Sequence, residues 1–275
     1  MNKINMKHIR LNSGYTISQV GLGTWMIKGD ECKNIVQEAI SKGYTHIDTA
    51  LRYENHEAIA QVIKNTKRTE LFITSKIWRD RLDYNGVLEQ VYTILEELGT
   101  DYIDLCLIHW PNKDFDMQDT FEALEELVNE GVIRSIGVSN FTINHLKKAI
   151  QVSNIPISVN QVEFHYKLYQ KELFDFCKKS NITLEAYSPL VHGEFLEDKN
   201  IEKLAKKYNK SSSQILLRWL IEKGVVVIPK TSKVERLNEN KDLFDFELSK
   251  EDHKFIDSLN EDKRIINPSF AEFNR

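Results

Sequence analysis

The chain contains 275 residues, of which 41% are hydrophobic and 28% are charged, and its formal net charge is −4. This length is sufficient for a sizeable hydrophobic core, and we expect residues 1–275 to form a single domain. Acidic and basic residues are interspersed, so the sequence shows no basic patch for a nucleic acid or an anionic membrane, and we expect neither as a partner.

The N-terminal ten residues lack the apolar segment of a signal peptide, and no apolar stretch is long enough to span a bilayer. The three cysteines, Cys32, Cys106 and Cys177, are widely spaced and odd in number, which is typical of reduced thiols. We therefore expect a soluble, cytoplasmic protein.

Strand-like and helical patterns alternate along the chain after a short predicted hairpin, whose turn is Asn12-Ser13-Gly14. The predicted strands cover 20–24, 45–49, 71–77, 102–108, 135–139, 157–162, 183–187 and 225–229. Amphipathic helical patterns lie between them, for example at 84–98. Two further helices are predicted outside this alternation, near 200–208 and 249–259. An alternation of this kind indicates a parallel sheet covered by helices.

Eight such units can close into a barrel or lie open as a doubly wound sheet. A dinucleotide-binding open sheet would carry the pattern G-x-G-x-x-G after a strand, but Gly21 and Gly23 are followed by Met26 where the third glycine would stand. The run 225–229 is apolar on both faces, which suits a strand between a packed interior and an outer ring of helices. The predicted fold is an α/β, (β/α)8 TIM barrel with an N-terminal β-hairpin and two extra helices.

Four chemically different side chains follow the ends of three successive predicted strands. Asp48 and Tyr53 follow the second strand, Lys76 ends the third and His109 follows the fourth. Because the carboxyl ends of barrel strands meet at one rim, these groups are expected to lie together. The Lys76 ammonium would lower the pKa of Tyr53 from about 10, and Asp48 would hold that ammonium in place. Tyr53 would then be a general acid, and neutral His109 would orient a substrate oxygen.

Each of these residues also has a purely structural interpretation. Asp48 could cap the following helix, and Lys76 could be a solvated charge. Tyr53 could pack at the rim, and His109 could be a core histidine. A metal-dependent hydrolase is another alternative, since His46 and Asp48 share a strand face. Lys76 disfavours it because an ammonium would repel a divalent cation, so we expect no bound metal.

A series of long motifs runs through the chain in the order VGLGTW, HIDTA, ITSKIW, DYIDLCLIHWP, IRSIGVSNF, NQVEFH, AYSPL and LRWLIEKGVVVIPKT. Together they resemble the aldo-keto reductase family, in its soluble bacterial branch similar to diketogluconate and methylglyoxal reductases. The resemblance implies a monomeric (β/α)8 barrel that binds NADPH without a Rossmann domain and reduces aldehydes or ketones to alcohols. Matched position by position, it implies Tyr53 as the general acid, Lys76 and Asp48 as its charge partners, and His109 as the residue that orients the carbonyl.

The resemblance also implies a set of cofactor contacts. Ser139, Asn140 and Gln161 are expected to hydrogen-bond the nicotinamide carboxamide, and the Tyr187 ring is expected to stack on the nicotinamide. Further expected cofactor contacts are Gly23, Thr24, Trp25, Ser188 and Leu190. In the adenosine-phosphate segment, Lys230, Ser232 and Arg236 are expected to bind the 2′-phosphate, and Glu239 and Asn240 the adenine. Thr231, in the same segment, is a further expected cofactor contact. Cations at the start of a helix favour NADPH over NADH. Thr231 occupies a position that varies in the family.

Three tryptophans, Trp25, Trp78 and Trp110, flank the predicted site and could form an aromatic substrate pocket for a small carbonyl compound. Trp78 could equally be a core residue. The short loops and the short tail after residue 265 indicate an open, permissive pocket and hence broad scope. An alternative function is an NADPH-binding sensor or subunit without significant turnover. The sequence does not rank the possible substrates.

Overall fold

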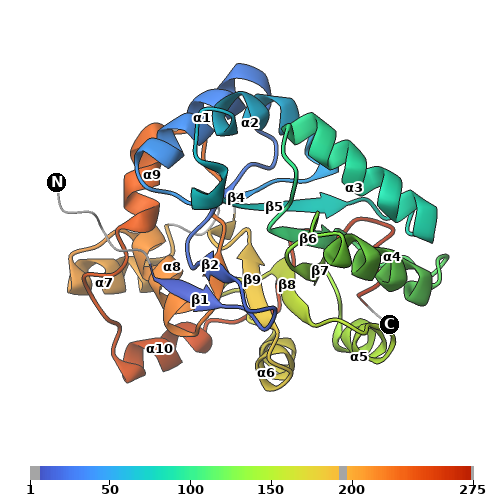
Figure 1. The fold of residues 1–275 in the computed structure, drawn as a ribbon. Helices are drawn as coiled ribbons and strands as arrows, with labels where there is room; N and C mark the ends of the chain where they lie inside the picture. The colour runs from blue at the N-terminus through green and yellow to red at the C-terminus, as the bar shows by residue number, and fades with distance from the viewer. Residues whose placement is uncertain (1–6, 192–196, 274–275) are drawn as a thin grey trace.

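Eight parallel strands follow one another in chain order around the centre of the molecule (Figure 1). They are β3 (Leu22–Gly23), β4 (His46–Asp48), β5 (Phe72–Ile77), β6 (Leu105–Ile108), β7 (Ile136–Ser139), β8 (Ile157–Glu163), β9 (Thr183–Tyr187) and β10 (Val226–Val227). The structure, a computed structural model, describes residues 7–191 and 197–273. The sheet closes through the segment just before β3, because Val20 pairs with Val227 of β10 and the amide of Val227 donates to the carbonyl of Gln19 at 2.9 Å. The sheet is closed, which confirms the predicted barrel.

The helices lie on the outer side of the strands (Figure 1). They are α1 (Gly29–Ser41), α2 (His56–Ile63), α3 (Tyr84–Leu98), α4 (Met117–Asn129), α5 (Ile143–Val152), α6 (Lys171–Lys179), α7 (Lys199–Tyr208), α8 (Ser212–Glu222), α9 (Val234–Lys241) and α10 (Lys250–Asp257). The two extra helices predicted near 200–208 and 249–259 are confirmed as α7 and α10. Within the described ranges, no helix is long and apolar enough to cross a bilayer.

The predicted N-terminal hairpin is confirmed as the antiparallel pair β1 (His8–Arg10) and β2 (Thr16–Ser18). Its side chains close one end of the barrel. A buried apolar cluster there comprises Leu11, Ile17, Phe72, Leu105, Leu107, Val159 and Val226. Burial of each such side chain contributes roughly 1.5–3 kcal/mol. Because Phe72 and Leu105 begin their strands, the hairpin seals the N-terminal end of the barrel and leaves the other end for chemistry.

Several strands are shorter than the sequence pattern predicted. β6 begins at Leu105 and not at residue 102, because the Asp104 carboxylate accepts a hydrogen bond from the amide of Ile73 at 2.9 Å, in place of a backbone carbonyl. The run 225–229 contributes only Val226–Val227 to β10, and Pro229 has no N–H to continue the ladder. Local side-chain chemistry therefore sets strand limits that apolar periodicity alone does not reveal.

Candidate active site at the open end of the barrel

The four predicted catalytic side chains come together at the C-terminal ends of β4, β5 and β6. Asp48 is the last residue of β4 and pairs in register with Thr74 of β5. Tyr53 ends a short 3-10 turn, Leu51–Tyr53, that directly follows β4. His109 follows β6, and its amide donates to the carbonyl of Ile77 at 3.0 Å. The strand order thus delivers all four groups to one rim, as the sequence predicted.

Lys76 is the centre of this group. Its Nζ donates to Asp48 Oδ1 at 2.6 Å, to the carbonyl oxygen of Thr49 at 2.9 Å and to the Tyr53 hydroxyl at 3.4 Å. These are three acceptors for the three protons of an ammonium. Lys76 is fully buried, and burial alone would lower its pKa, but Asp48 and Tyr53 together raise the pKa above its ordinary value. The lysine is therefore charged at neutral pH, and Asp48 is its counter-ion.

The pKa of Tyr53 differs from the expectation. Lys76 does act to lower it, but burial of the phenol is the larger effect, and the pKa of Tyr53 lies above its ordinary value. The expectation of a lowered pKa was wrong because it counted the neighbouring charge and not the loss of water. The phenol consequently keeps its proton at neutral pH. The ammonium then acts mainly on the phenolate that forms once the proton has been given away.

His109 is a neutral imidazole in this environment. Burial, followed by the charge on Lys76, lowers the pKa of His109 well below its usual range. Its ring packs edge-on against Tyr53 and Trp78, with centroid distances of 5.7 and 5.2 Å. Within the described residues, its buried Nδ1 has no hydrogen-bond partner. A neutral ring beside the phenol is able to donate one hydrogen bond to a substrate oxygen.

The residues expected around the nicotinamide adjoin the four catalytic candidates. Asn140 donates to the carbonyl of His109 at 3.0 Å and to Ser139 Oγ at 3.1 Å, and accepts from the Tyr187 hydroxyl at 2.8 Å. Asn140 has φ +63°, a left-handed conformation that asparagine tolerates. Gln161 donates to Asp48 Oδ2 at 2.7 Å. These side chains therefore form one hydrogen-bonded surface continuous with the catalytic group.

The other expected cofactor contacts divide between the interior and the rim. Thr24 is buried, and its hydroxyl donates to the carbonyl of Asp48 at 2.8 Å. Gly23 is buried too, and a Cβ there would lie 2.7 Å from the carbonyl oxygen of Ile228. Ser188 and Leu190 follow β9 and are partly exposed, whereas Trp25 is 42% exposed. Thr24 and Gly23 thus lie beneath the rim, and their contact with the cofactor stays a prediction.

The expected phosphate-binding segment forms the loop after β10 and the first turn of α9. Lys230, Ser232 and Arg236 are exposed there, and neither cation forms an ion pair with a carboxylate of the described chain. Thr231 is buried, and its Oγ1 accepts from the amide of Lys233 at 3.0 Å, so its role is to shape the loop. Unpaired cations at a helix N-terminus suit an anion.

The two residues expected at the adenine are less available. Glu239 is partly buried and accepts a hydrogen bond from Ser211 Oγ at 2.5 Å. Asn240 is only 4% exposed. Both side chains are therefore largely enclosed by the described chain, and their contact with the adenine stays a prediction.

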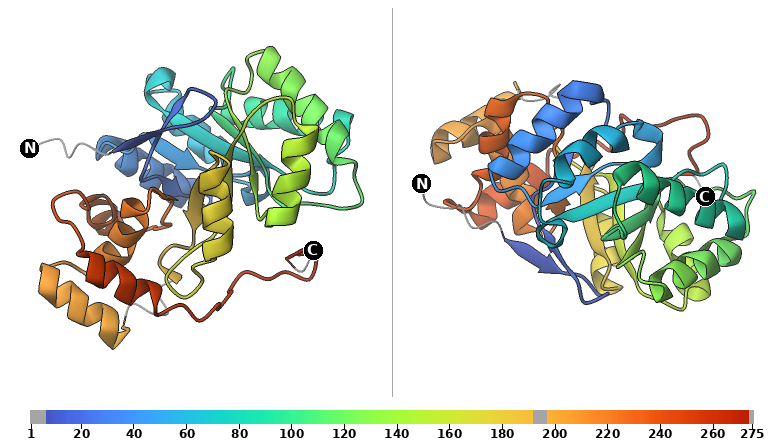
Figure 2. Two further views of the ribbon diagram at one scale, coloured as in Figure 1. Left: turned by 90° about the horizontal axis from the view of Figure 1, so that it is seen from below. Right: turned by 45° about the horizontal axis from the view of Figure 1, so that its top comes forward.

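The C-terminal tail packs against two of the tryptophans expected at the substrate site, a contact that the sequence did not predict. The Phe270 ring lies 5.9 Å from Trp78 and 5.4 Å from Trp110, and Phe273 lies 5.7 Å from Trp110. Figure 2 shows the tail, in red, running from α10 across the molecule toward the green helices. The tail therefore lies against Trp78 and Trp110 and does not point away from the expected site. Nothing in local periodicity indicates which rings a tail will contact, so sequence reasoning missed Phe270.

Hydrogen bonds from two parts of the chain hold the tail in that position. Glu163, fully buried in β8, accepts from the amides of Ile265 and Ile266, both at 2.8 Å. Further along, Glu272 accepts from the amide of Lys113 at 3.1 Å. Glu163 was a detectable signal, because it is a carboxylate in an otherwise uncharged strand.

Glu185 is a second carboxylate that sequence reasoning missed. It lies in the middle of β9, is fully buried, and accepts from Gln161 Nε2 at 2.9 Å. Its other oxygen lies 3.5 Å from Nε2 of His46. The run TLEAY contains one charged residue among apolar neighbours, which was the available signal.

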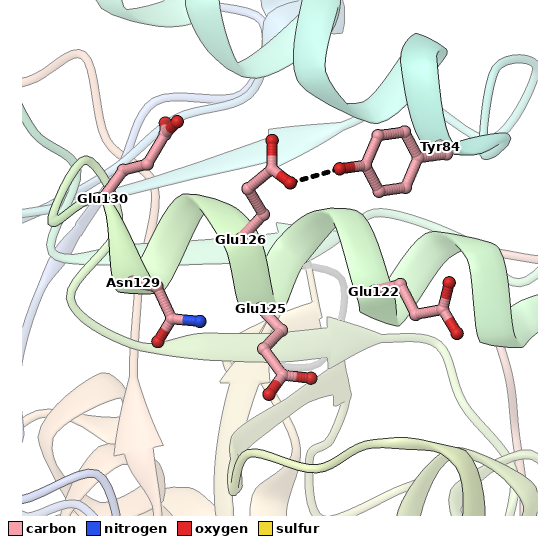
Figure 3. A pocket seen from close by; sticks show the side chains of 6 residues that line it. All are labelled: Tyr84, Glu122, Glu125, Glu126, Asn129 and Glu130. Atoms are coloured by element: carbon pink, nitrogen blue, oxygen red, sulfur yellow. Dashed lines mark hydrogen bonds between the residues drawn. The ribbon is translucent and has the colours of Figure 1, made fainter.

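A large surface hollow, of about 500 Å3, lies elsewhere, on the outer faces of α3 and α4 (Figure 3). Tyr84 and Glu126 point toward one another across it, and Glu122, Glu125 and Glu130 also line it. This density of carboxylates would repel an anionic cofactor. No three His, Cys, Asp or Glu side chains of the described chain are grouped in a way that could hold a metal.

Comparison with known proteins agrees with this geometry. The model of the aldo/keto reductase family matches residues 19–261. The glyoxal reductase of Bacillus subtilis (strain 168) is 47% identical over 260 residues, which cover 94% of each chain. The methylglyoxal reductase DkgA of Escherichia coli (strain K12) is 38% identical over 262 residues, again 94% of each. The structure of a Bombyx mori aldo-keto reductase, AKR2E4, in complex with NADP superposes with a TM-score of 0.90 at 36% identity, over 96% of each chain. The chain therefore belongs to the aldo-keto reductase family, and it is an oxidoreductase that acts on carbonyl groups.

Proposed function

We propose that the protein is an NADPH-dependent reductase of small aldehydes and ketones in which Tyr53 is the general acid. The observation that carries the proposal is the hydrogen-bonded series from Asp48 through Lys76 to Tyr53, next to a neutral His109. Tyr53 and His109 are the two members of the group that are partly exposed, so a substrate can reach them.

The proposed reaction needs one hydride and one proton. NADPH, when bound, supplies the hydride to the carbonyl carbon. As negative charge develops on the carbonyl oxygen, Tyr53 donates its phenolic proton to that oxygen and an alcohol forms. The phenolate left behind is stabilised by the Lys76 ammonium 3.4 Å away, and solvent returns the proton after the product leaves. His109 donates a hydrogen bond to the same oxygen and fixes its direction.

The choice of NADPH is supported by the exposed cations of the β10 loop. Lys230 and Arg236 flank the N-terminus of α9 and are unpaired within the described chain, as a 2′-phosphate site requires. The half-buried Tyr187 ring, held by its hydrogen bond to Asn140, is a suitable stacking surface for the nicotinamide.

Small dicarbonyl compounds are the first substrates to test, because two relatives are named glyoxal reductase and methylglyoxal reductase. The experiment is steady-state oxidation of NADPH with about a dozen aldehydes, ketones and keto acids, glyoxal and methylglyoxal included. Turnover of at least one of them supports the proposal. If NADPH binds and no carbonyl compound is reduced, the protein is a cofactor-binding sensor or subunit instead.

A further inference from the structure

Glu185 lies directly beneath the proposed catalytic group, inside the barrel. It pairs in register with Gln161 of β8 on one side and with Val226 of β10 on the other. Across the barrel it faces His46 of β4, whose Nε2 also lies 3.1 Å from the hydroxyl of Thr74. The side chain of Glu185 is fully buried. Glu185 takes no part in the proposed proton transfer, in substrate binding or in anchoring the tail.

Both N–H groups of the Gln161 side-chain amide already donate hydrogen bonds within the protein. A primary amide has two N–H groups and one carbonyl oxygen. In Gln161 one N–H is given to Asp48 Oδ2 at 2.7 Å and the other to Glu185 Oε2 at 2.9 Å. The carbonyl oxygen of Gln161 is therefore the one polar atom of this side chain left for a ligand, and it can only accept.

The charges around Glu185 agree with this arrangement. Burial, and then the negative charge of Asp48, raise the pKa of Glu185 to about 8, so the group is protonated at neutral pH. Oε1 has no hydrogen-bond partner in the described chain and is the oxygen free to carry that proton, whereas Oε2 accepts from Gln161. Burial and Lys76 lower the pKa of His46 to about 3, so the nearby ring is neutral too. The negative charge of Asp48 and the positive charge of Lys76 then compensate each other.

We propose that Glu185 is a positioning residue of the cofactor site: by accepting one N–H of Gln161, it holds the amide with its carbonyl oxygen toward the nicotinamide carboxamide, whose NH2 group that oxygen binds. This inference rests on the proposed function, since it assumes that Gln161 contacts the nicotinamide. The hydrogen-bonded series Glu185, Gln161, Asp48 links cofactor recognition to the counter-ion of Lys76. Without Glu185, one N–H of Gln161 loses its acceptor. Rotation of the amide would then let this N–H find a new acceptor on the cofactor, and the carbonyl oxygen would no longer face the carboxamide NH2.

The test is a comparison of two oxidised cofactors, NADP+ and its 3-acetylpyridine analogue, whose acetyl group keeps the carbonyl oxygen but has no NH2. Dissociation constants are measured by quenching of tryptophan fluorescence, so turnover is not needed. The wild-type protein is expected to bind NADP+ about tenfold more tightly than the analogue, because the analogue cannot donate to Gln161. In Glu185→Leu the preference is expected to fall to about twofold or less.

Two further variants separate positioning from a general loss of structure. Glu185→Gln keeps an acceptor oxygen at the same place and is expected to retain the preference. Glu163→Leu removes another fully buried carboxylate, one that binds the tail and not Gln161, and is also expected to retain it. A preference that survives in Glu185→Leu, or that disappears in Glu185→Gln or Glu163→Leu, would overturn the inference. Equal binding of both cofactors by the wild type would overturn it as well, whereas the reductase proposal is judged separately by turnover.

Discussion

Lys76 Nζ lies 2.6 Å from Asp48 Oδ1, and both side chains are shielded from solvent. A buried ion pair of this kind costs desolvation energy on both partners, and its stability depends on each charge compensating the other. Lys76 of this pair also donates a hydrogen bond to the Tyr53 hydroxyl. It therefore connects the stability of the barrel interior with the chemistry at the rim.

Removal of one partner of this pair is expected to be more harmful than removal of both. Lys76→Met leaves Asp48 buried without its counter-ion, and the free energy of unfolding should fall by about 3–5 kcal/mol. In the double variant Asp48→Asn with Lys76→Met no buried charge is left unpaired, so part of that stability should return. Urea unfolding measures both effects. Asp48→Asn alone leaves the Lys76 ammonium buried without its counter-ion and should also be destabilised. Additive losses in the two single variants and the double variant would contradict this view. Carbonyl reduction should be strongly impaired in all three.

The cofactor preference is expected to depend on Arg236. Arg236→Ala should raise the KM for NADPH by about 10- to 100-fold and leave the KM for NADH nearly unchanged, because NADH carries no 2′-phosphate. Arg10→Ala is a matched control, since Arg10 is an exposed arginine in the hairpin at the opposite end of the barrel. An equal effect of Arg236→Ala on both cofactors would argue against the phosphate assignment.

The tail is expected to contribute to substrate binding and not to the chemical step. Phe270→Ala removes the ring that contacts both Trp78 and Trp110, so the KM for a small aldehyde should rise about tenfold while the affinity for NADPH is kept. Phe255→Ala, at a 41% exposed phenylalanine of α10, is the control and should change neither value. A large change in kcat with an unchanged KM would mean that the ring acts on the transition state instead.

The protonation of Glu185 predicts how stability depends on pH. Its pKa is about 8 in the folded protein and 4.5 in an unfolded chain, so the folded state holds a proton that the unfolded state releases. The stabilisation is fully present below pH 4.5 and is lost as the pH rises toward 8, by at most about 1.4 kcal/mol per pH unit. The difference in unfolding free energy between the wild type and Glu185→Gln, measured in urea across this range, should fall as the pH rises. A difference that is independent of pH would show that Glu185 is ionised in the fold.

The barrel and the meeting of the catalytic group were predictable from the sequence because they follow from strand order. Parallel strands in chain order must bring Asp48, Lys76 and His109 to the same rim, whatever the exact strand limits are. The limits were less predictable, since the Asp104 carboxylate replaces a ladder acceptor for Ile73. Such an exchange depends on a side chain and leaves no trace in the apolar pattern.

Features that depend on burial or on distant contacts were not predictable in the same way. The predicted lowering of the Tyr53 pKa was wrong, because the charge on Lys76 can be inferred from the sequence spacing but the desolvation of the phenol cannot. The position of Phe270 against Trp78 depends on bonds between Glu163 and the tail, about 100 residues apart. Glu185 was visible as a lone charge in an apolar strand, but its partner Gln161 became evident only from the register of β8 and β9.

The most direct test of the proposed chemistry is single-turnover reduction of methylglyoxal by the preformed NADPH complex, with the wild type compared with Tyr53→Phe. The variant keeps the ring and loses the proton donor. We expect its rate of NADPH oxidation to be about 10²- to 10⁴-fold lower, with the dissociation constant of NADPH unchanged within about twofold. A Tyr53→Phe variant that reduces the substrate at the wild-type rate would contradict the assignment of Tyr53 as the general acid.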